Sequence, residues 1–268
     1  MSAAALQGRL DAAAPMLSVQ GLGRRFGRQT ACSGIAFDLW PGEVLAVVGE
    51  SGSGKTTLLR CLAGLLPPSA GAVLYRGAAT GPLDLVTASE GERRRLGRTD
   101  WGFVHQDPRD GLRMGVSAGA NIGERLMALG DRHYGNLRGM ALDWLDRVEI
   151  PRDRVDDLPQ TFSGGMRQRL QIARNLVTAP RLVFMDEPTG GLDVSVQARL
   201  LDLIRGLVAD MGLSVVIVTH DLAVARLLSH RILVMRRGRV VEAGLTDQVL
   251  DDPQHEYSQL LVASILQA

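Results

Sequence analysis

Hydrophobic residues in this chain gather in short apolar runs, which alternate with longer segments where apolar positions recur every three or four residues. The short runs predict buried strands, and the longer spacing predicts amphipathic helices. Predicted strands cover residues 17–19, 35–39, 44–48, 72–75, 101–104, 181–185, 214–218, 232–235 and 239–242. Predicted helices cover residues 57–62, 167–177, 196–210 and 254–266. This alternation predicts an α/β fold with a mostly parallel central sheet.

The same pattern predicts how the chain is divided. From Ser117 to about Ala179 the apolar spacing is helical only, which predicts a helical subdomain, residues 117–179, inserted into the α/β core. Residues 77–98 lose periodicity and include three consecutive arginines, so we expect an exposed insertion, with a solvated helix face favoured over a binding site. Residues 1–15 are expected to form a disordered arm, and residues 16–268 a single domain.

Composition argues against several function classes. The 30 lysines and arginines balance 29 aspartates and glutamates, so no overall basic field favours nucleic acid as a partner. The two cysteines, Cys32 and Cys61, are too few for a disulfide framework and lack metal-ligand spacing, which favours a reducing cytoplasm. No apolar run approaches the roughly 18 residues of a membrane span. We therefore expect a cytoplasmic protein with no direct membrane span.

The segment after the strand at 44–48 carries the strongest chemical signal. Its sequence, GESGSGKT, has the spacing of a Walker A loop, which cradles nucleotide phosphates between a strand and a helix. Lys55 would reach the outer phosphates, and Thr56 would ligate Mg²⁺. The alternative, a glycine-rich turn with a chance lysine, is disfavoured by the flanking strand and helix. The predicted nucleotide-binding residues are Gly49, Glu50, Ser51, Gly52, Ser53, Gly54, Lys55, Thr56 and Thr57.

Two adjacent carboxylates follow the apolar strand at 181–185, as in a Walker B motif. Asp186 would hold Mg²⁺, directly or through water, and Glu187 would orient and deprotonate the attacking water. A strand end capped by two solvated acids is the alternative. Gln106 and His220 each follow a predicted strand, so both are expected at the edge where nucleotides bind. Either residue alone is more often a surface or capping residue.

A third motif begins the helix at 167–177. Ser163, Gly164, Gly165 and Met166 would place backbone N–H groups and the positive end of the helix dipole at a second anion site. Taken alone, this segment fits an ordinary glycine-opened helix better. Its functional interpretation depends on the other motifs.

The complete ordered set resembles that of ABC-type ATPases: Walker A, Gln106, FSGGM at 162–166, LVFMDEP at 182–188, GGLD at 190–193 and His220. The resemblance implies a P-loop core, an antiparallel β subdomain and an inserted α-helical subdomain. It implies binding of ATP and Mg²⁺, and hydrolysis by a head-to-tail dimer, because the signature residues Ser163–Met166 of one protomer cap the nucleotide of the other. Met166 departs from the family's commoner glutamine, but oligopeptide-importer ATPases share it.

The resemblance also implies roles for single residues. Phe26 would stack on adenine, although a small core aromatic is the alternative. His220 would contact the γ-phosphate, and Gln106 would sense both the metal and the water, alongside the metal ligands Thr56 and Asp186. Asp193 would communicate across the dimer.

Several longer segments resemble the ATP-binding subunits of the phosphonate carbon–phosphorus lyase system. These are the charged loop at 107–114, residues 124–127 and 132–135, PTGGLDVSVQARLLDL at 188–203 and TDQVLDDPQHEYSQLL at 246–261. The resemblance implies docking on a soluble lyase core complex, whose conformation changes with ATP turnover by this subunit and a second, identical or related, ABC protomer. The lyase chemistry would belong to other chains, because this one lacks the cysteine cluster of an iron–sulfur radical site.

Two other functions stay open. The FSGGM signature and the C-terminal HEYSQLL also fit the motor subunit of a membrane importer for oligopeptides, nickel or phosphonates, although the charged loop at 109–113 argues against it. An ATP-gated assembly clamp with negligible turnover is disfavoured by Glu187, because a clamp can dispense with a general base.

Overall fold

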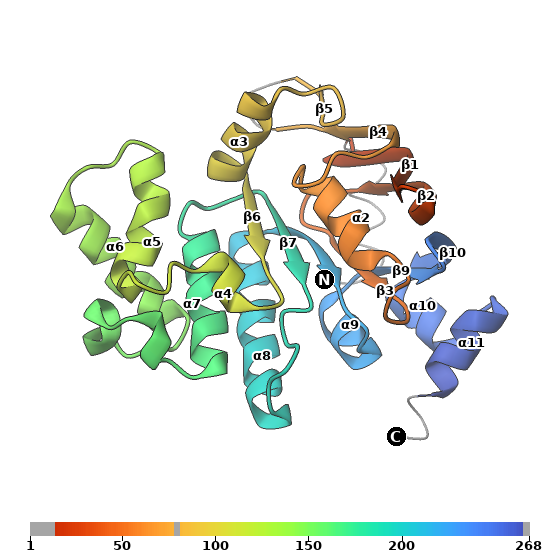
Figure 1. Cartoon of the computed structure of the whole chain (residues 1–268). Helices are drawn as coiled ribbons and strands as arrows, with labels where there is room; N and C mark the ends of the chain where they lie inside the picture. Colours follow the sequence, from red (N-terminus) through yellow and green to blue (C-terminus); the bar gives the residue numbers. More distant parts are fainter. Residues whose placement is uncertain (1–13, 78–80, 265–268) are drawn as a thin grey trace. The chain divides into compact units, whose positions relative to one another are not determined.

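The computed structural model describes residues 14–77 and 81–264. The chain divides into two compact units (Figure 1). The first unit comprises Met1–Arg93 and Gly212–Ala268, and the second comprises Arg94–Met211. Helix α3 (Glu90–Thr99) carries the boundary between them.

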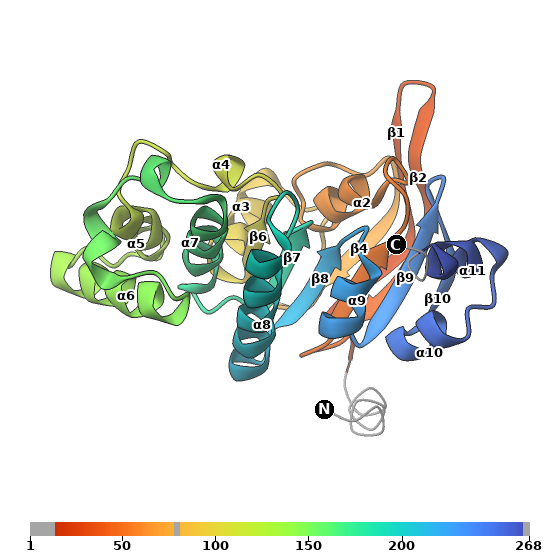
Figure 2. The ribbon, with the colours of Figure 1, turned by 90° about the horizontal axis from the view of Figure 1, so that it is seen from below.

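The first unit contains a four-stranded antiparallel sheet with the order β2-β1-β4-β5. Its strands are β1 (Leu17–Phe26), β2 (Gln29–Leu39), β4 (Ala70–Tyr75) and β5 (Leu83–Asp84). Strands β1 and β2 form a long hairpin, which Figure 2 shows from its side. The pairing register shifts after Val19 and again after Leu22, so bulges interrupt the alternation of side chains along β1.

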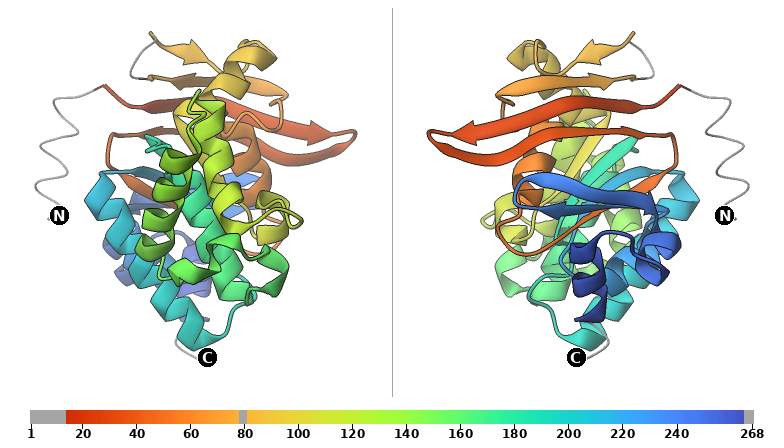
Figure 3. Two further views of the ribbon diagram at one scale, coloured as in Figure 1. Left: turned by 90° about the vertical axis from the view of Figure 1, so that its left-hand side faces the viewer. Right: turned by 90° about the vertical axis from the view of Figure 1, so that its right-hand side faces the viewer.

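A second sheet of this unit has the order β10-β9-β3-β8, and its strands are β3 (Val44–Val48), β8 (Ser214–Val218), β9 (Arg231–Arg236) and β10 (Arg239–Leu245). Strand β3 runs parallel to β8 and β9, whereas β9 and β10 are antiparallel. All residues of β3 and β8 are buried, which explains their continuous apolar runs. The helices of this unit are α2 (Lys55–Leu62), α9 (Leu222–Leu228), α10 (Thr246–Asp251) and α11 (Glu256–Ala263). Helix α10 packs beside the β9–β10 hairpin (Figure 3).

The second unit combines a parallel strand pair with helices. Strands β6 (Trp101–Val104) and β7 (Leu182–Asp186) pair with Phe103 opposite Phe184. The helices are α4 (Pro108–Gly111), α5 (Ala118–Ala128), α6 (Tyr134–Arg147), α7 (Gly164–Leu176) and α8 (Val194–Met211), with 3-10 turns at Arg152–Asp156 and Pro159–Thr161. Helices α5, α6 and α7 pack on one another (Figure 1).

The expectation for residues 77–98 was wrong in part. Residues 78–80 lie outside the described part of the chain, but β5 and α3 are regular elements, and Leu85, Ala88 and Leu96 are buried. Arg94 and Arg95 are exposed on α3, as expected for a solvated helix face. Of the predicted arm, residues 1–13 lie outside the described residues, and Ala14 and Pro15 belong to no helix or strand.

Candidate functional site

The loop between β3 and α2 is built around two glycines that no other residue can replace without moving the backbone. Gly49 has φ +147° and Gly54 has φ +101°, both in the region that L residues rarely adopt. A Cβ atom on Gly49 would lie 2.1 Å from the carbonyl oxygen of Met235, and one on Gly54 would lie 2.1 Å from that of Ala31. The two close approaches fix the loop against β9 and β2.

Polar groups in this loop fit a phosphate ligand. The side chain of Lys55 is buried, and its Nζ donates to the carbonyl oxygens of Gly49 at 2.8 Å and Glu50 at 2.9 Å. These contacts hold the ammonium against the loop backbone. The Oγ of Ser53 is buried and has no hydrogen-bond partner among the described residues. A phosphate oxygen satisfies such a hydroxyl, and the helix that begins at Lys55 adds its positive end.

A residue from the end of the chain supports this loop. The hydroxyl of Tyr257, on α11, accepts a hydrogen bond of 2.9 Å from the backbone N–H of Glu50. The ring is buried, and the guanidinium of Arg236 lies 4.8 Å from its centroid. Sequence analysis did not find this contact, because its two residues are 207 positions apart.

Phe26 and His220 also belong to the first unit. Phe26 lies at the tip of the β1–β2 hairpin, is 47% exposed and has the guanidinium of Arg24 4.7 Å from its ring centroid. It is therefore not a core aromatic, and the alternative interpretation of this residue is wrong. His220 is exposed two residues after the end of β8, and Asp221 beside it caps α9.

The two carboxylates lie where β7 ends, in the second unit. Asp186 is 3% exposed, and the Oε2 of Glu187 accepts a hydrogen bond of 3.1 Å from the Nε2 of Gln106. Glu187 has φ +43°, a left-handed conformation that is uncommon for a residue with a long side chain. Such backbone strain is found most often at functional sites. Gln106 and Glu187 are thus brought together as their sequence positions suggested.

The donor set fits magnesium bound with a nucleotide. Among the described residues no group of three or more His, Cys, Asp or Glu is arranged to hold a metal. Mg²⁺ is usually held by one or two carboxylates together with substrate phosphates and waters. In the second unit Asp186 offers a carboxylate and Gln106 an amide oxygen, and in the first unit Thr56 offers a hydroxyl. Each is a ligand type that Mg²⁺ accepts.

The FSGGM segment begins α7. The Oγ of Ser163 accepts a hydrogen bond of 3.2 Å from the N–H of Met166, and the Ser163 side chain is exposed. A Cβ atom on Gly165 would lie 2.5 Å from Val196 of α8, so this glycine permits close packing of the two helices. Gly164 lies beside Leu192 of the GGLD segment.

The GGLD segment is held by Gln197 of α8. The Nε2 of Gln197 donates to the carbonyl oxygens of Leu192 at 2.9 Å and Thr189 at 3.2 Å. Asp193 is exposed, and Val194 beside it is 82% exposed. The segment therefore offers a carboxylate and an apolar side chain to solvent.

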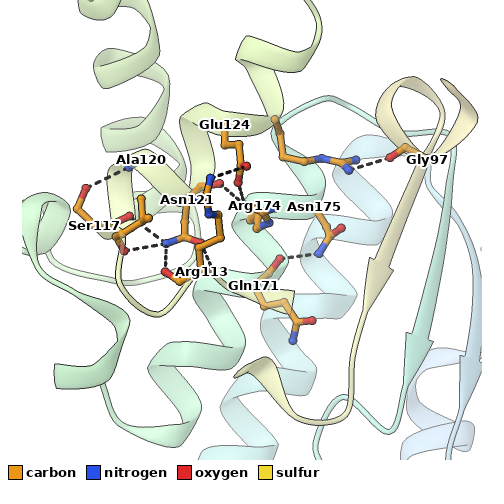
Figure 4. A network of polar contacts seen from close by, with 11 residues as sticks. Gly97, Arg113, Ser117, Ala120, Asn121, Glu124, Gln171, Arg174 and Asn175 are labelled. Carbon is orange, nitrogen blue, oxygen red and sulfur yellow. Dashed lines mark hydrogen bonds and ion pairs between the residues drawn. The ribbon is translucent and has the colours of Figure 1, made fainter. Parts of the chain in front are cut away.

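Buried amides on α7 form a further contact that sequence analysis missed. Gln171 and Asn175, both drawn in Figure 4, are almost fully buried. They bind the backbone of Phe103 in β6 and of His105, which precedes Gln106. Two amides at i and i+4 among apolar positions of an amphipathic helix were the available signal.

Comparison with known proteins identifies the family. The family model described as ABC transporter matches residues 32–190. The chain belongs to the ABC transporter family. Its fold is the ABC nucleotide-binding domain, and it is an ABC-type ATPase.

Curated relatives include proteins of phosphonate use and of peptide import. The putative phosphonates utilization ATP-binding protein PhnK of Escherichia coli K12 is 65% identical over 253 residues, which are 94% of this chain and 98% of that protein. The dipeptide transport ATP-binding protein DppD of Bacillus subtilis 168 is 36% identical over 261 residues, which are 93% of this chain and 76% of that protein. The similarity to the phosphonate protein extends over both chains.

Solved ATP-binding cassettes have the same fold. A dimeric cassette in a post-hydrolysis state, bound to ADP and Pi, matches with a TM-score of 0.77 and 27% identity, covering 86% of this chain and 99% of that one. The structure of cbiO1 from Clostridium perfringens, part of the ABC transporter complex cbiONQ, matches with a TM-score of 0.76 and 28% identity, covering 89% of this chain and 91% of that one. None of the helices in the described residues is long and apolar enough to cross a membrane.

Proposed function

We propose that this chain is the ATP-driven subunit of a phosphonate-utilisation system, which docks on a soluble carbon–phosphorus lyase core complex and changes the conformation of that complex as it turns over ATP. The observation that carries the proposal is the 65% identity to the phosphonates utilization protein, compared with 36% to the dipeptide transport protein. Both relatives are named ATP-binding proteins, one of phosphonates utilization and one of dipeptide transport. The higher identity to the first therefore favours a partner complex of phosphonate utilisation over a dipeptide permease.

For ATP turnover, the phosphate loop binds the triphosphate through backbone N–H groups, Lys55 and Ser53. Thr56 and Asp186 would hold Mg²⁺, which would supply positive charge to offset that of the phosphates. Glu187 accepts the proton of the attacking water, and Gln106, 3.1 Å from its carboxylate, orients both. His220 contacts the γ-phosphate, and Phe26 stacks on adenine.

The active form in this proposal is a head-to-tail dimer with a second copy or a related ABC subunit. Ser163, Gly164, Gly165 and Met166 of one protomer cap the nucleotide of the other. The exposure of Ser163 and of Val194 beside Asp193 supports this arrangement, since these surfaces would be covered by the partner. The similarity to cassettes solved as dimers supports it further.

The charged loop after Gln106 is the proposed docking surface. Asp107 caps the short helix α4 by accepting from the N–H of Arg109 at 2.9 Å, and the side chains of Arg109 and Asp110 are exposed. Leu112, which follows α4, is buried. The loop therefore presents charge on a fixed backbone, which suits a polar protein surface better than the apolar end of a membrane helix.

Arg113 is bound within the second unit, which makes it a poor probe of docking. Its guanidinium pairs with Glu124 at 3.0 Å, and Glu124 pairs with Arg174 at 2.7 Å (Figure 4). Partial burial opposes ionisation of Glu124, but the hydrogen bonds and charges of Arg174 and Arg113 outweigh it and lower its pKa below the usual value. Asn121 binds both the N–H and the carbonyl oxygen of Arg113. Reversing the charge of Arg113 would disturb this network, so the test rests on Arg109.

The test is an affinity pull-down of the tagged chain, fractionated into membrane and supernatant, with every companion identified. We expect soluble multi-enzyme companions, which would also place the protein in the cytoplasm. Arg109→Glu should lose these companions and keep its ATPase activity, whereas Arg239→Glu, an exposed arginine on β10, should keep both. Normal recovery of companions by Arg109→Glu contradicts the docking assignment.

The second candidate is the motor subunit of a membrane importer. It is supported by the identity of 36% to the dipeptide transport protein and by the shared FSGGM signature. Integral permeases among the companions would favour it over the lyase-associated function.

A further inference from the structure

Strand β6 is an edge strand, because β7 is the only strand that pairs with it in the described part of the chain. It pairs with β7 on one side, and on its other side it meets helix α7. An edge strand presents backbone N–H and carbonyl groups that need partners when they are buried. The side-chain amides of Gln171 and Asn175 on α7, both drawn in Figure 4, supply these partners.

The spacing of the two elements makes this pairing possible. The N–H groups of Phe103 and His105 lie on the same side of the strand, about 6.6 Å apart, because residues i and i+2 of a strand share a side. Helical residues i and i+4 are about 6 Å apart along the axis. Asn175 Oδ1 accepts from the N–H of Phe103 at 3.0 Å, and Gln171 Oε1 accepts from the N–H of His105 at 2.6 Å.

Gln171 holds both backbone groups of one residue. Besides accepting from the N–H of His105, its Nε2 donates to the carbonyl oxygen of His105 at 3.1 Å. The side chain is fully buried, and its Nε2 also donates to Gln168 at 3.2 Å. Gly111, the last residue of α4, lies against this amide, since a Cβ atom there would lie 2.2 Å from Gln171 Oε1. Gln171 is thus fixed by helix, strand and loop together.

The residue after His105 is Gln106, which reaches Glu187 at 3.1 Å. We propose that Gln171 is a positioning residue for hydrolysis: its amide fixes the backbone from which Gln106 orients Glu187 and the water. This inference rests on the proposed ATPase mechanism. Asn175 binds Phe103 three residues before Gln106, and has no such role.

The same helix connects Gln106 to the signature segment. Helix α7 begins at Gly164, with Ser163 as its cap, and Gln171 lies about 12 Å along the axis from Ser163, at 1.5 Å per residue. Ser163 caps α7, and Gln171 within the same helix binds the backbone of His105, so a shift of Ser163 would also move the backbone next to Gln106. The position of the signature segment and the position of Gln106 are therefore linked through Gln171.

The test compares two nearly isosteric substitutions that each remove amide hydrogen bonds to the β6 edge. Gln171→Met should lower kcat about tenfold or more while the Kd for MgATP stays within about twofold of that of the wild type. Asn175→Leu should lower the thermal midpoint to a similar extent and leave kcat within about twofold. If the two substitutions acted only by lowering stability, Gln171→Met and Asn175→Leu would have similar kcat values.

Gly111→Ala gives an independent result if Gln171→Met does not fold. The added methyl displaces the Gln171 amide without removing it, so kcat should fall while the Kd for MgATP holds. The inference is overturned if Gln171→Met and Gly111→Ala keep the wild-type kcat, or if Asn175→Leu loses as much kcat as Gln171→Met. A wild-type protein without turnover overturns the proposed mechanism instead, and the inference with it.

Discussion

The hydroxyl of Tyr257, near the end of the chain, accepts a hydrogen bond of 2.9 Å from the backbone N–H of Glu50 in the phosphate loop. The bond fixes one edge of the loop from a helix that is otherwise remote in sequence. Helix α11 is itself anchored, because His255 caps it and the N–H groups of Gln254 and His255 donate to Glu242. The C-terminal segment therefore contributes to the shape of the nucleotide cradle.

Tyr257→Phe should weaken binding of MgATP about two- to tenfold, the range expected when one hydrogen bond is lost. The ring and its packing against Arg236 remain, so the thermal midpoint should change little. Titration calorimetry measures the Kd. Tyr134→Phe is the control, because Tyr134 is 72% exposed and lies in the other unit. Equal affinity in all three proteins would show that the loop keeps its shape without this bond.

Glu187→Gln should reduce ATP turnover by about a hundredfold or more, because the amide cannot accept the proton of the water. Nucleotide binding should persist, and an ATP-bound dimer should accumulate, as seen by size-exclusion chromatography. Glu149→Gln is the matched control: Glu149 lies in the same unit, also has a left-handed backbone, with φ +54°, and has no role in the proposed site. Unchanged hydrolysis by Glu187→Gln would refute its assignment as the base.

The apolar runs predicted the central strands well, because those strands are buried on both faces. Residues 44–48 and 214–218 coincide with β3 and β8. The prediction for the first strand stopped at Val19, whereas β1 continues to Phe26. Bulges after Val19 and Leu22 shift the register, so the alternation that identifies a half-buried strand is lost. A sequence pattern cannot reveal strands whose periodicity is broken in this way.

The residues of the candidate site were proposed from local motifs. The glycines of the phosphate loop and the approach of Gln106 to Glu187 follow from sequence spacing and strand ends. Tyr257 and Gln171 could not be found in that way, because each supports the site through a contact distant in sequence. Such contacts depend on tertiary packing. The residue type alone does not show whether a polar side chain is buried or exposed.

The substitutions Gly52→Ala and Gly54→Ala should differ in their effects on stability and on MgATP affinity. Both have left-handed φ angles, +81° and +101°, so each substitution incurs backbone strain of about 1–2 kcal/mol. A Cβ atom at Gly52 has no neighbour within 4 Å, whereas one at Gly54 would collide with the carbonyl oxygen of Ala31. Gly54→Ala should therefore lower the thermal midpoint and the MgATP affinity more than Gly52→Ala. Equal losses of thermal midpoint and affinity in the two variants would mean that glycine is needed at both positions for its backbone conformation alone.

His230 connects pH to the stability of the first unit. Its Nδ1 accepts a hydrogen bond of 2.9 Å from the N–H of Val44, at the start of β3. Burial lowers the pKa of this imidazole below its ordinary value of 6.5. Only the neutral ring can accept this hydrogen bond. Protonation of His230 is therefore less favourable in the folded protein than in the unfolded chain.

The unfolded chain therefore binds more protons than the folded protein below about pH 6.5, and stability must fall as the pH decreases through that range. Above pH 6.5 both states are neutral at this position, and the contribution is constant. His230→Asn keeps an acceptor near Val44 but does not titrate. Thermal unfolding at pH 7.5 and pH 5.5 should show a larger loss of midpoint in the wild type than in His230→Asn. Identical losses would mean that other groups set the acid sensitivity, and that protonation of His230 is tolerated because the β3 N–H finds another partner.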